Sequence, residues 1–136
     1  MRVYRTMTEQ QAIELVRVHA AAIATVVGVD AGQTETLVSR AACENSRGEL
    51  ADDGRFYIQG NWQMPLPAAE QASTLARLRD GWAAQGYGIK KFQMFSDDEG
   101  LIIAENPVDE VELMVESGVP PIALAIVIIT PCYRPL

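Results

Sequence analysis

The fold is decided by two runs of residues near the C-terminus, EVELMVE at 110–116 and IALAIVII at 122–129. In the first run apolar and acidic residues alternate, which is typical of an antiparallel strand with one face buried and the other in water. The second run is apolar at every position, so we expect a strand that is covered on both sides or paired centrally under a layer of helices. Both runs therefore predict parts of a sheet.

Four more runs have the composition of strands: residues 34–43, 55–62, 87–95 and 101–104. In the second of these, Phe56, Ile58 and Trp62 share one face. The turn signal Asp53-Gly54 precedes this run, so the first two runs predict a hairpin. Short turns separate the later strands, which favours pairing of each strand with the next along the chain.

Two segments predict amphipathic helices. The first lies between a capping box, formed by Thr8 and Gln11, and a C-terminal cap at Gly28. Its apolar residues recur every three or four positions, at Ile13, Val16, Ala20, Ile23 and Val27. The second begins near Pro67, ends at Gly86, and carries an apolar stripe of Leu75, Leu78 and Trp82.

These elements predict one α+β domain over residues 1–136, with residues 1–7 as a flexible or extended N-terminal segment. We expect a single antiparallel β-sheet of about six strands, in the order helix-β-β-helix-β-β-β-β, with the two amphipathic helices packed on it. A membrane span is not expected, because no stretch of about 20 residues is free of charges and turn formers.

Charge is distributed unevenly along the chain. The 18 acidic and 11 basic residues give a net charge of −7, and residues 97–136 carry eight acids against one base, Arg134. Nucleic acid and anionic membranes are poor partners for such a surface, since both bind through Lys and Arg. The face formed by Glu110, Glu112 and Glu116 is a candidate site for a basic protein partner, or a solvated surface that confers solubility.

No motif for catalysis or for a cofactor is present. His19 is the one histidine, and its position in the first helix predicts a helix-face residue near the edge of the core. Serine residues lack the glycines of a nucleophile elbow, and no phosphate-binding loop occurs. We therefore expect no enzyme, no cofactor and no metal site, and assign no catalytic residue.

Aromatic residues offer one candidate for a ligand site. Trp62, Trp82 and Tyr87 fall on predicted elements that face the boundary between sheet and helices. Such rings most often belong to a core and its rim, but a pocket lined by them is the alternative. That alternative predicts a small-ligand carrier or an enzyme.

Cys43 and Cys132 are too far apart in sequence for a local metal knuckle or a redox pair. Two buried thiols and a single disulfide both remain open from the residues alone. The first six residues contain no apolar leader segment and no lipid-attachment motif. We therefore expect a cytoplasmic protein, or an extracytoplasmic one whose leader has been removed from this sequence.

Several short motifs resemble one group of proteins. The C-terminal segment resembles that of small actinobacterial cell-envelope lipoproteins, which close on (Ser/Thr)-Pro-Cys; here it reads Ile128-Ile129-Thr130-Pro131-Cys132-Tyr133-Arg134-Pro135. Three further features are similar to the same group: the run LIIAENP at 101–107, the pairs Gly81-Trp82 and Gly86-Tyr87, and an early strand cysteine. The likeness covers about residues 8–135. It implies an α+β domain that is exported and tethered outside the membrane, with Cys43 bonded to Cys132, and it implies no particular activity.

Three functions follow as expectations. The first is a non-enzymatic, extracytoplasmic binding or interaction domain of the cell envelope, whose partner is an unknown protein or small ligand. The second is an acidic cytosolic inhibitor, such as an immunity protein that covers a basic toxin. The third is the small-ligand carrier or enzyme with the aromatic pocket.

Overall fold

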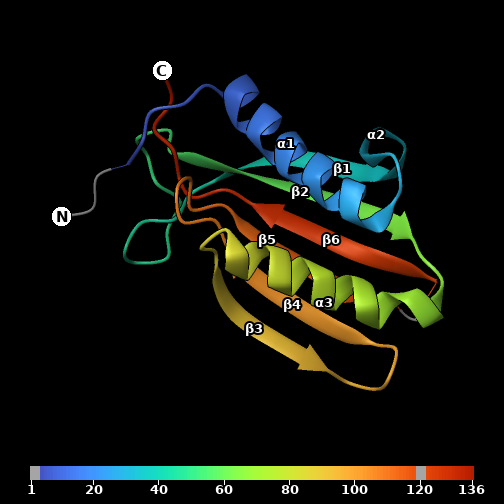
Figure 1. Ribbon diagram of the computed structural model, residues 1–136. Coiled ribbons are helices and arrows are strands. Elements are labelled where there is room, and N and C mark those ends of the chain that lie inside the picture. The colour runs from blue at the N-terminus through green and yellow to red at the C-terminus, as the bar shows by residue number, and fades with distance from the viewer. Residues whose placement is uncertain (1–3, 119–121) are drawn as a thin grey trace.

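The computed structural model describes residues 4–118 and 122–136. Their helices and strands follow the predicted order, with one short helix added (Figure 1). The elements are α1 (Glu9–Val27), α2 (Ala31–Thr34), β1 (Glu35–Ala42), β2 (Phe56–Pro65), α3 (Ala68–Ala84), β3 (Gly88–Met94), β4 (Gly100–Glu105), β5 (Glu112–Ser117) and β6 (Ala123–Ile129). None of the described helices has the length and apolar character needed to cross a membrane.

The strands form one antiparallel sheet in the order β1-β2-β6-β5-β4-β3. This confirms the predicted α+β fold, the β1–β2 hairpin and the pairing of β3 to β6 with their neighbours along the chain. The apolar run at 122–129 supplies β6, which lies between β2 and β5. Its central place explains why this strand carries no charge: both of its edges are paired, and one of its faces lies under the helices.

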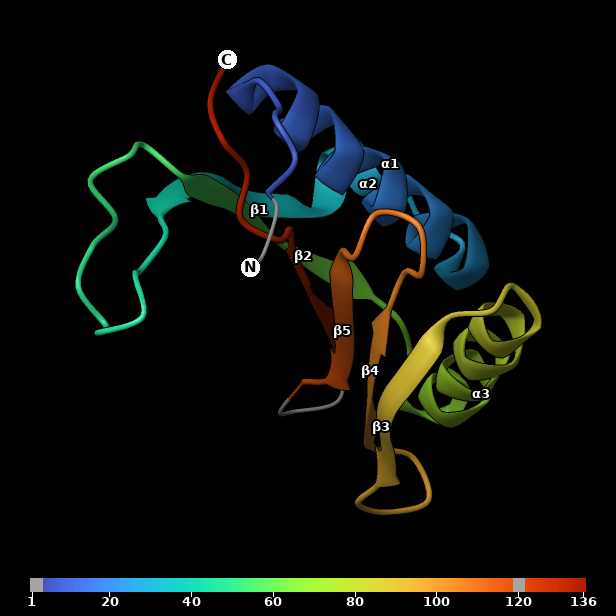
Figure 2. The same cartoon turned by 90° about the vertical axis from the view of Figure 1, so that its left-hand side faces the viewer.

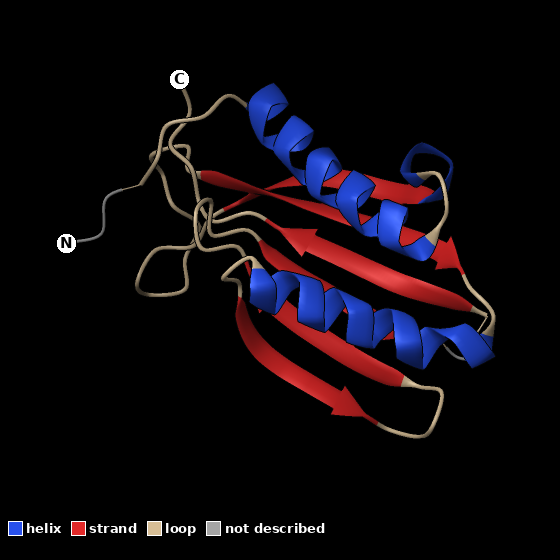
Figure 3. Cartoon of the chain, viewed as in Figure 1, coloured by secondary structure: helices blue, strands red, loops and turns tan. Residues whose placement is uncertain are grey.

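The helices cover one face of the sheet. Figures 1 and 3 show α1 and α3 in front of the strands, and the turned view in Figure 2 places both helices on the same side. α1 packs on β2, and α3 packs on β3 and β4. The largest fully buried side chains between the layers are Ile23, Phe56, Ile58, Trp62, Met64, Leu75, Ile102, Leu113, Leu124, Ile126 and Ile128.

The first helix begins and ends as predicted. The Gln11 backbone N–H donates to Thr8 Oγ1 over 3.0 Å, and the Thr8 N–H donates to Gln11 Oε1 over 3.0 Å, which completes the capping box. Gly28 closes the helix with φ of 92°, a conformation that favours glycine. Ala20 and Ala24 are buried against the sheet side, where their small side chains allow close approach.

The short helix α2 was not predicted. Asp30 caps it by accepting hydrogen bonds from the N–H groups of Gly32 and Gln33, at 2.7 and 3.3 Å. A helix of four residues is too short to show an amphipathic period, so its cap is the main sequence signal. It carries the chain from α1 to the edge strand β1.

In residues 4–118 and 122–136, no helix or further strand lies on the side of the sheet opposite the helices, and we call this side the uncovered face. Alternate residues of four strands point there: Gln59, Asn61 and Gln63 of β2, Ala125, Val127 and Ile129 of β6, Glu112, Met114 and Glu116 of β5, and Ile103 and Glu105 of β4. The predicted half-exposed strand is confirmed for residues 112–116, since buried and partly exposed residues alternate along β5, whereas residues 110–111 precede the strand. The loop between β1 and β2 extends on this side, away from the helices (Figure 2).

The two ends of the described chain lie together. The Met7 N–H donates to the Arg134 carbonyl over 3.0 Å, and the Arg134 N–H donates to the Arg5 carbonyl over 2.9 Å. Residues 4–7 thus run beside the C-terminal segment, whereas residues 1–3 of the predicted N-terminal segment lie outside the described residues.

Candidate binding site

A disulfide joins Cys43, directly after β1, to Cys132, which follows β6. Their Cα atoms are 6.3 Å apart, and 89 positions separate the two residues in sequence. Backbone pairing brings them together: Phe56 pairs with Ala42 on one side and exchanges two hydrogen bonds with Tyr133, of 2.8 and 3.0 Å, on the other. Of the two alternatives that the residues left open, the structure has the disulfide.

A hollow of about 390 Å³ lies beside this bond, at the end of the uncovered face. We call it the disulfide hollow; its lining residues are Tyr4, Tyr57, Gln59, Ile129, Thr130, Pro131 and Cys132. Tyr57 and Gln59 reach it because they alternate along β2 with the buried Phe56 and Ile58. Its volume is at the lower end of the range for small-ligand pockets.

Internal contacts hold the polar walls of the disulfide hollow. The Thr130 hydroxyl donates to the Pro131 carbonyl and accepts from the Ile58 N–H, both over 2.9 Å. The Gln59 amide nitrogen donates to Asn61 Oδ1 over 3.2 Å. These contacts fix the orientation of the Thr130 hydroxyl and the Gln59 amide, so the hollow combines apolar surface with preset polar groups.

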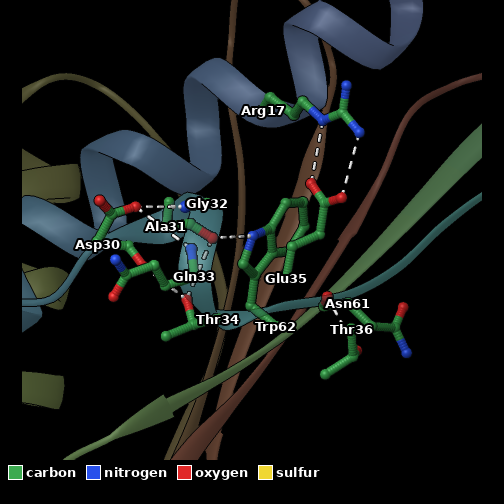
Figure 4. Close-up of polar contacts among 10 residues, drawn as sticks. All are labelled: Arg17, Asp30, Ala31, Gly32, Gln33, Thr34, Glu35, Thr36, Asn61 and Trp62. Carbon is green, nitrogen blue, oxygen red and sulfur yellow. Dashed lines mark hydrogen bonds and ion pairs between the residues drawn. The ribbon is translucent and has the colours of Figure 1, made fainter.

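A second hollow, of about 400 Å³, lies between α1, α2 and β1, and Trp62 forms part of its wall. Figure 4 shows how this wall is held: Trp62 Nε1 donates to the Ala31 carbonyl over 3.1 Å, and Arg17 binds both carboxylate oxygens of Glu35. The Arg17–Glu35 distances are 3.0 and 3.1 Å, and the hydrogen bond to Glu35 raises the pKa of Arg17. The guanidinium is therefore already satisfied by a carboxylate of the same chain.

Trp82 and Tyr87 lie elsewhere, at the end of α3. Their rings are stacked, with centroids 5.9 Å apart, and border a hollow of about 100 Å³. Trp62 borders the hollow beside α2 instead, so the structure does not bring the three predicted pocket residues together. The sequence correctly placed Trp62, Trp82 and Tyr87 near the boundary between sheet and helices. It did not show that Trp62 lies beside α2, whereas Trp82 and Tyr87 lie at the end of α3.

The predicted acidic face is divided in the structure. Glu112 and Glu116 point to the uncovered face from β5, while Glu110 precedes the strand in a turn and has φ of 63°. Lys90 of β3 reaches across β4 and donates to Glu112 over 2.9 Å and to Glu105 over 3.3 Å. The hydrogen bond to Glu112 raises the pKa of Lys90, so the ammonium offsets part of the acidic charge. Lys90 therefore links the edge strand β3 to the acidic residues of β4 and β5.

His19 has a partner that the sequence did not reveal. Its Nε2 lies 2.8 Å from Asp109 Oδ2, and its side chain is largely buried on the face of α1 that meets the β4–β5 turn. Asp109 is held by its own contact, since Oδ1 accepts from the Val111 N–H over 2.9 Å. The pair therefore ties α1 to a turn 90 residues away. Among residues 4–118 and 122–136, no three His, Cys, Asp or Glu side chains are grouped so that they could hold a metal ion.

The buried hydroxyl of Tyr133 leads to a prediction about the stability of the fold at alkaline pH. Its ring packs against Phe56, and its buried hydroxyl makes no hydrogen bond of good geometry to a described residue. Burial, followed by the negative charge of Asp109, raises the pKa of Tyr133 to about 12. The folded state holds this proton more tightly than the unfolded state, so its contribution to stability is complete below about pH 10 and is lost as the pH rises through 12.

We therefore expect the free energy of unfolding to fall by about 1 kcal/mol between pH 9 and pH 11 through this group. Urea unfolding at both pH values measures the change. Tyr133→Phe is the matched control, because it keeps the ring and removes the titrating group. An equal loss in the parent protein and in Tyr133→Phe would contradict the assignment.

The resemblance to exported proteins that close on (Ser/Thr)-Pro-Cys stays a prediction, although the disulfide that it implied is present. No protein-family model matches the chain, and no curated protein and no solved structure matches it either.

Proposed function

We propose that this chain is a non-enzymatic, extracytoplasmic binding domain of the cell envelope, and that it binds its ligand in the disulfide hollow. The observation that carries the proposal is the Cys43–Cys132 bond, with a preformed hollow beside it. The bond supports export because disulfides persist in oxidising compartments and are rare in the cytosol. The hollow supports binding because it joins apolar walls to oriented polar groups.

The chemistry of the hollow favours an aromatic or apolar group as ligand. Tyr57 offers a ring, and Ile129 and Pro131 offer apolar surface. The Gln59 amide supplies a polar contact at the same wall. A ligand group of the size of an indole or phenol ring fits the volume of about 390 Å³, with room for a short polar substituent.

Titration with indole and with phenol, followed by amide chemical shifts, tests this site. We expect the largest shifts at Tyr57, Gln59 and Ile129. Tyr57→Ala should weaken binding by roughly threefold to tenfold, because an aromatic pair contributes about 0.5–1.5 kcal/mol. Gln63→Ala is the matched control, since Gln63 lies on the same strand and the same face but outside the hollow. Shifts centred on Trp62 or Trp82 would contradict the assignment.

The proposed compartment has its own test. Protein isolated from its native cells under thiol-blocking conditions is expected to carry no blocked thiol, and to expose no reactive thiol when it is then denatured without reductant. Two blocked thiols per chain would contradict an extracytoplasmic location, and the cytoplasmic alternative would then be favoured.

The alternative function, an acidic inhibitor of a basic protein, has less support than the proposed binding domain. Its predicted surface needs Glu110, Glu112 and Glu116 to act together on a basic partner. Lys90 already binds Glu112, and Glu110 belongs to a turn outside β5. The aromatic-pocket carrier draws less support as well, because Trp62 borders a different hollow from Trp82 and Tyr87.

A further inference from the structure

We propose that the outer edge of β1 pairs with β1 of a second copy of this chain, so that two sheets join into one. The last five residues of β1, Val38–Ala42, are the basis of this proposal. β1 is an end strand of the sheet, and no residue of β1 is buried. A strand of eight residues thus stands at the edge with most of its side chains in solvent.

Hydrogen bonding shows which backbone groups face outward. The Cys43 N–H donates to the Arg55 carbonyl, so Cys43 bonds towards β2, and the regular register from Leu37 to Ala42 continues to this pair. Because neighbours in an antiparallel ladder bond to opposite sides, Val38, Arg40 and Ala42 direct their N–H and C=O groups to the outer edge. None of the described residues bonds to these outward groups.

The other edge of the sheet is protected against such pairing, whereas on this edge the register shift lies between Glu35 and Leu37 and the segment Val38–Ala42 is regular. β3 carries Lys90 and Lys91, and its register shifts between Ile89 and Lys91. Lysine residues and bulges are devices that keep edge strands from pairing with other chains. The segment Val38–Ala42 contains no lysine, no proline and no register shift.

The one charged side chain of this segment is held away from the edge. Arg40 lies over the Phe56 ring, with 4.4 Å from its guanidinium carbon to the ring centroid. It also lies 3.4 Å from a Glu9 carboxylate oxygen and 3.4 Å from the Gly54 carbonyl. Its charge is therefore paired on the helix side of the sheet, which leaves the outward backbone groups accessible.

Charge favours a second copy at this edge over one at the uncovered face. β5 and β4 present Glu112, Glu116 and Glu105 on the uncovered face, where two copies would bring like charges together. Beside β1, Arg17 pairs with Glu35 and Arg40 pairs with Glu9, so this region carries balanced charge. An approach through β1 therefore keeps the acidic residues of the uncovered face of one copy away from those of the other, and brings together regions of balanced charge.

One register fits best when the two strands are related by a two-fold axis. In this register the two-fold axis passes between the Ser39 residues of the two copies. The exposed Leu37 of each copy then lies opposite Ala41 of the other. The outward N–H and C=O groups of Val38 in one copy bond to those of Arg40 in the other. A register centred on Arg40 would set two like charges opposite each other, which is unfavourable. In the favoured register the two Ser39 residues form a non-hydrogen-bonded pair, with Cα atoms about 4.5 Å apart.

Sedimentation equilibrium with the full chain is the first test. Because an edge contact is small, we expect a weak dimer that dominates by about 0.5 mM chain, with twice the 14.9 kDa mass of one chain. Ser39→Lys sets two lysines opposite each other and should weaken dimerisation at least tenfold. Gln93→Lys is the matched control: it adds the same charge on the same face of the other edge strand, and should leave the dimer intact.

Cross-linking tests the register. Both native cysteines are in the disulfide, so Ser39→Cys introduces one free thiol. We expect mild oxidation to link Ser39→Cys chains into a covalent dimer, and to leave Gln93→Cys chains unlinked. A chain that stays monomeric up to about 0.5 mM, a dimer that survives Ser39→Lys, or cross-linking through Gln93→Cys would each overturn the proposal.

Discussion

The double variant Cys43→Ser/Cys132→Ser is expected to unfold with a free energy about 4–5 kcal/mol below that of the parent protein. The disulfide closes a loop across 89 sequence positions, and in the chain-entropy account such a loop removes many conformations from the unfolded state. A change of this size is a large fraction of the total stability of a domain of this length. Urea unfolding followed by tryptophan fluorescence measures it.

Reductant provides the control for this variant. Dithiothreitol should lower the urea midpoint of the parent protein towards that of the double variant, and should leave the double variant unchanged. If the reduced parent kept its midpoint, the bond would contribute little, and the entropic argument would be wrong for this chain.

Gly60→Ala is expected to destabilise the fold by about 1–3 kcal/mol, because it overfills the core. Gly60 lies on β2 beneath α1, and a methyl group there would come within 2.5 Å of the Trp62 ring and 2.8 Å of Val16 Cγ1. Both neighbours are fully buried, so neither can turn aside without moving others. Equilibrium unfolding gives the change in free energy, and near-ultraviolet circular dichroism reports any shift of the Trp62 ring.

Gly81→Ala is the matched control with the opposite expected sign. Gly81 lies within α3, and a methyl group there meets nothing within 4 Å. Alanine should therefore stabilise the helix by about 0.5–1 kcal/mol, because it restricts the unfolded chain and favours helix. A similar loss of stability in both variants would show that close packing at Gly60 is not the cause.

Periodicity in the sequence predicted most of the fold. The capping box at Thr8, the apolar stripe of α1 and the alternation in β5 are local patterns, and each appears in the structure as expected. The four-residue α2 was missed because it is shorter than one period of the pattern. The last three residues of β2 were also missed: the predicted strand ended at Trp62, whereas β2 continues to Pro65.

The candidate site was harder to predict because its parts come from distant segments. Tyr57 and Ile129 meet at the disulfide hollow only because β2 pairs with β6, which the sequence did not specify. Asp109 lies 90 positions from His19, and no local spacing connects them. The pairing of Cys43 with Cys132 was implied by the resemblance, whereas the residues alone left two free thiols as an alternative.

The position of the covalent cross-link also limits how this protein can respond to mechanical tension. Force applied at the two ends passes from Cys43 directly to Cys132 through the sulfur atoms, so the segment between them carries none of it. Only residues before Cys43 and after Cys132 can be drawn out, to roughly 160 Å, compared with roughly 460 Å for the whole chain without the cross-link. Under load, β2 to β6 and α3 would therefore stay within a closed ring while α1, α2 and β1 peel away.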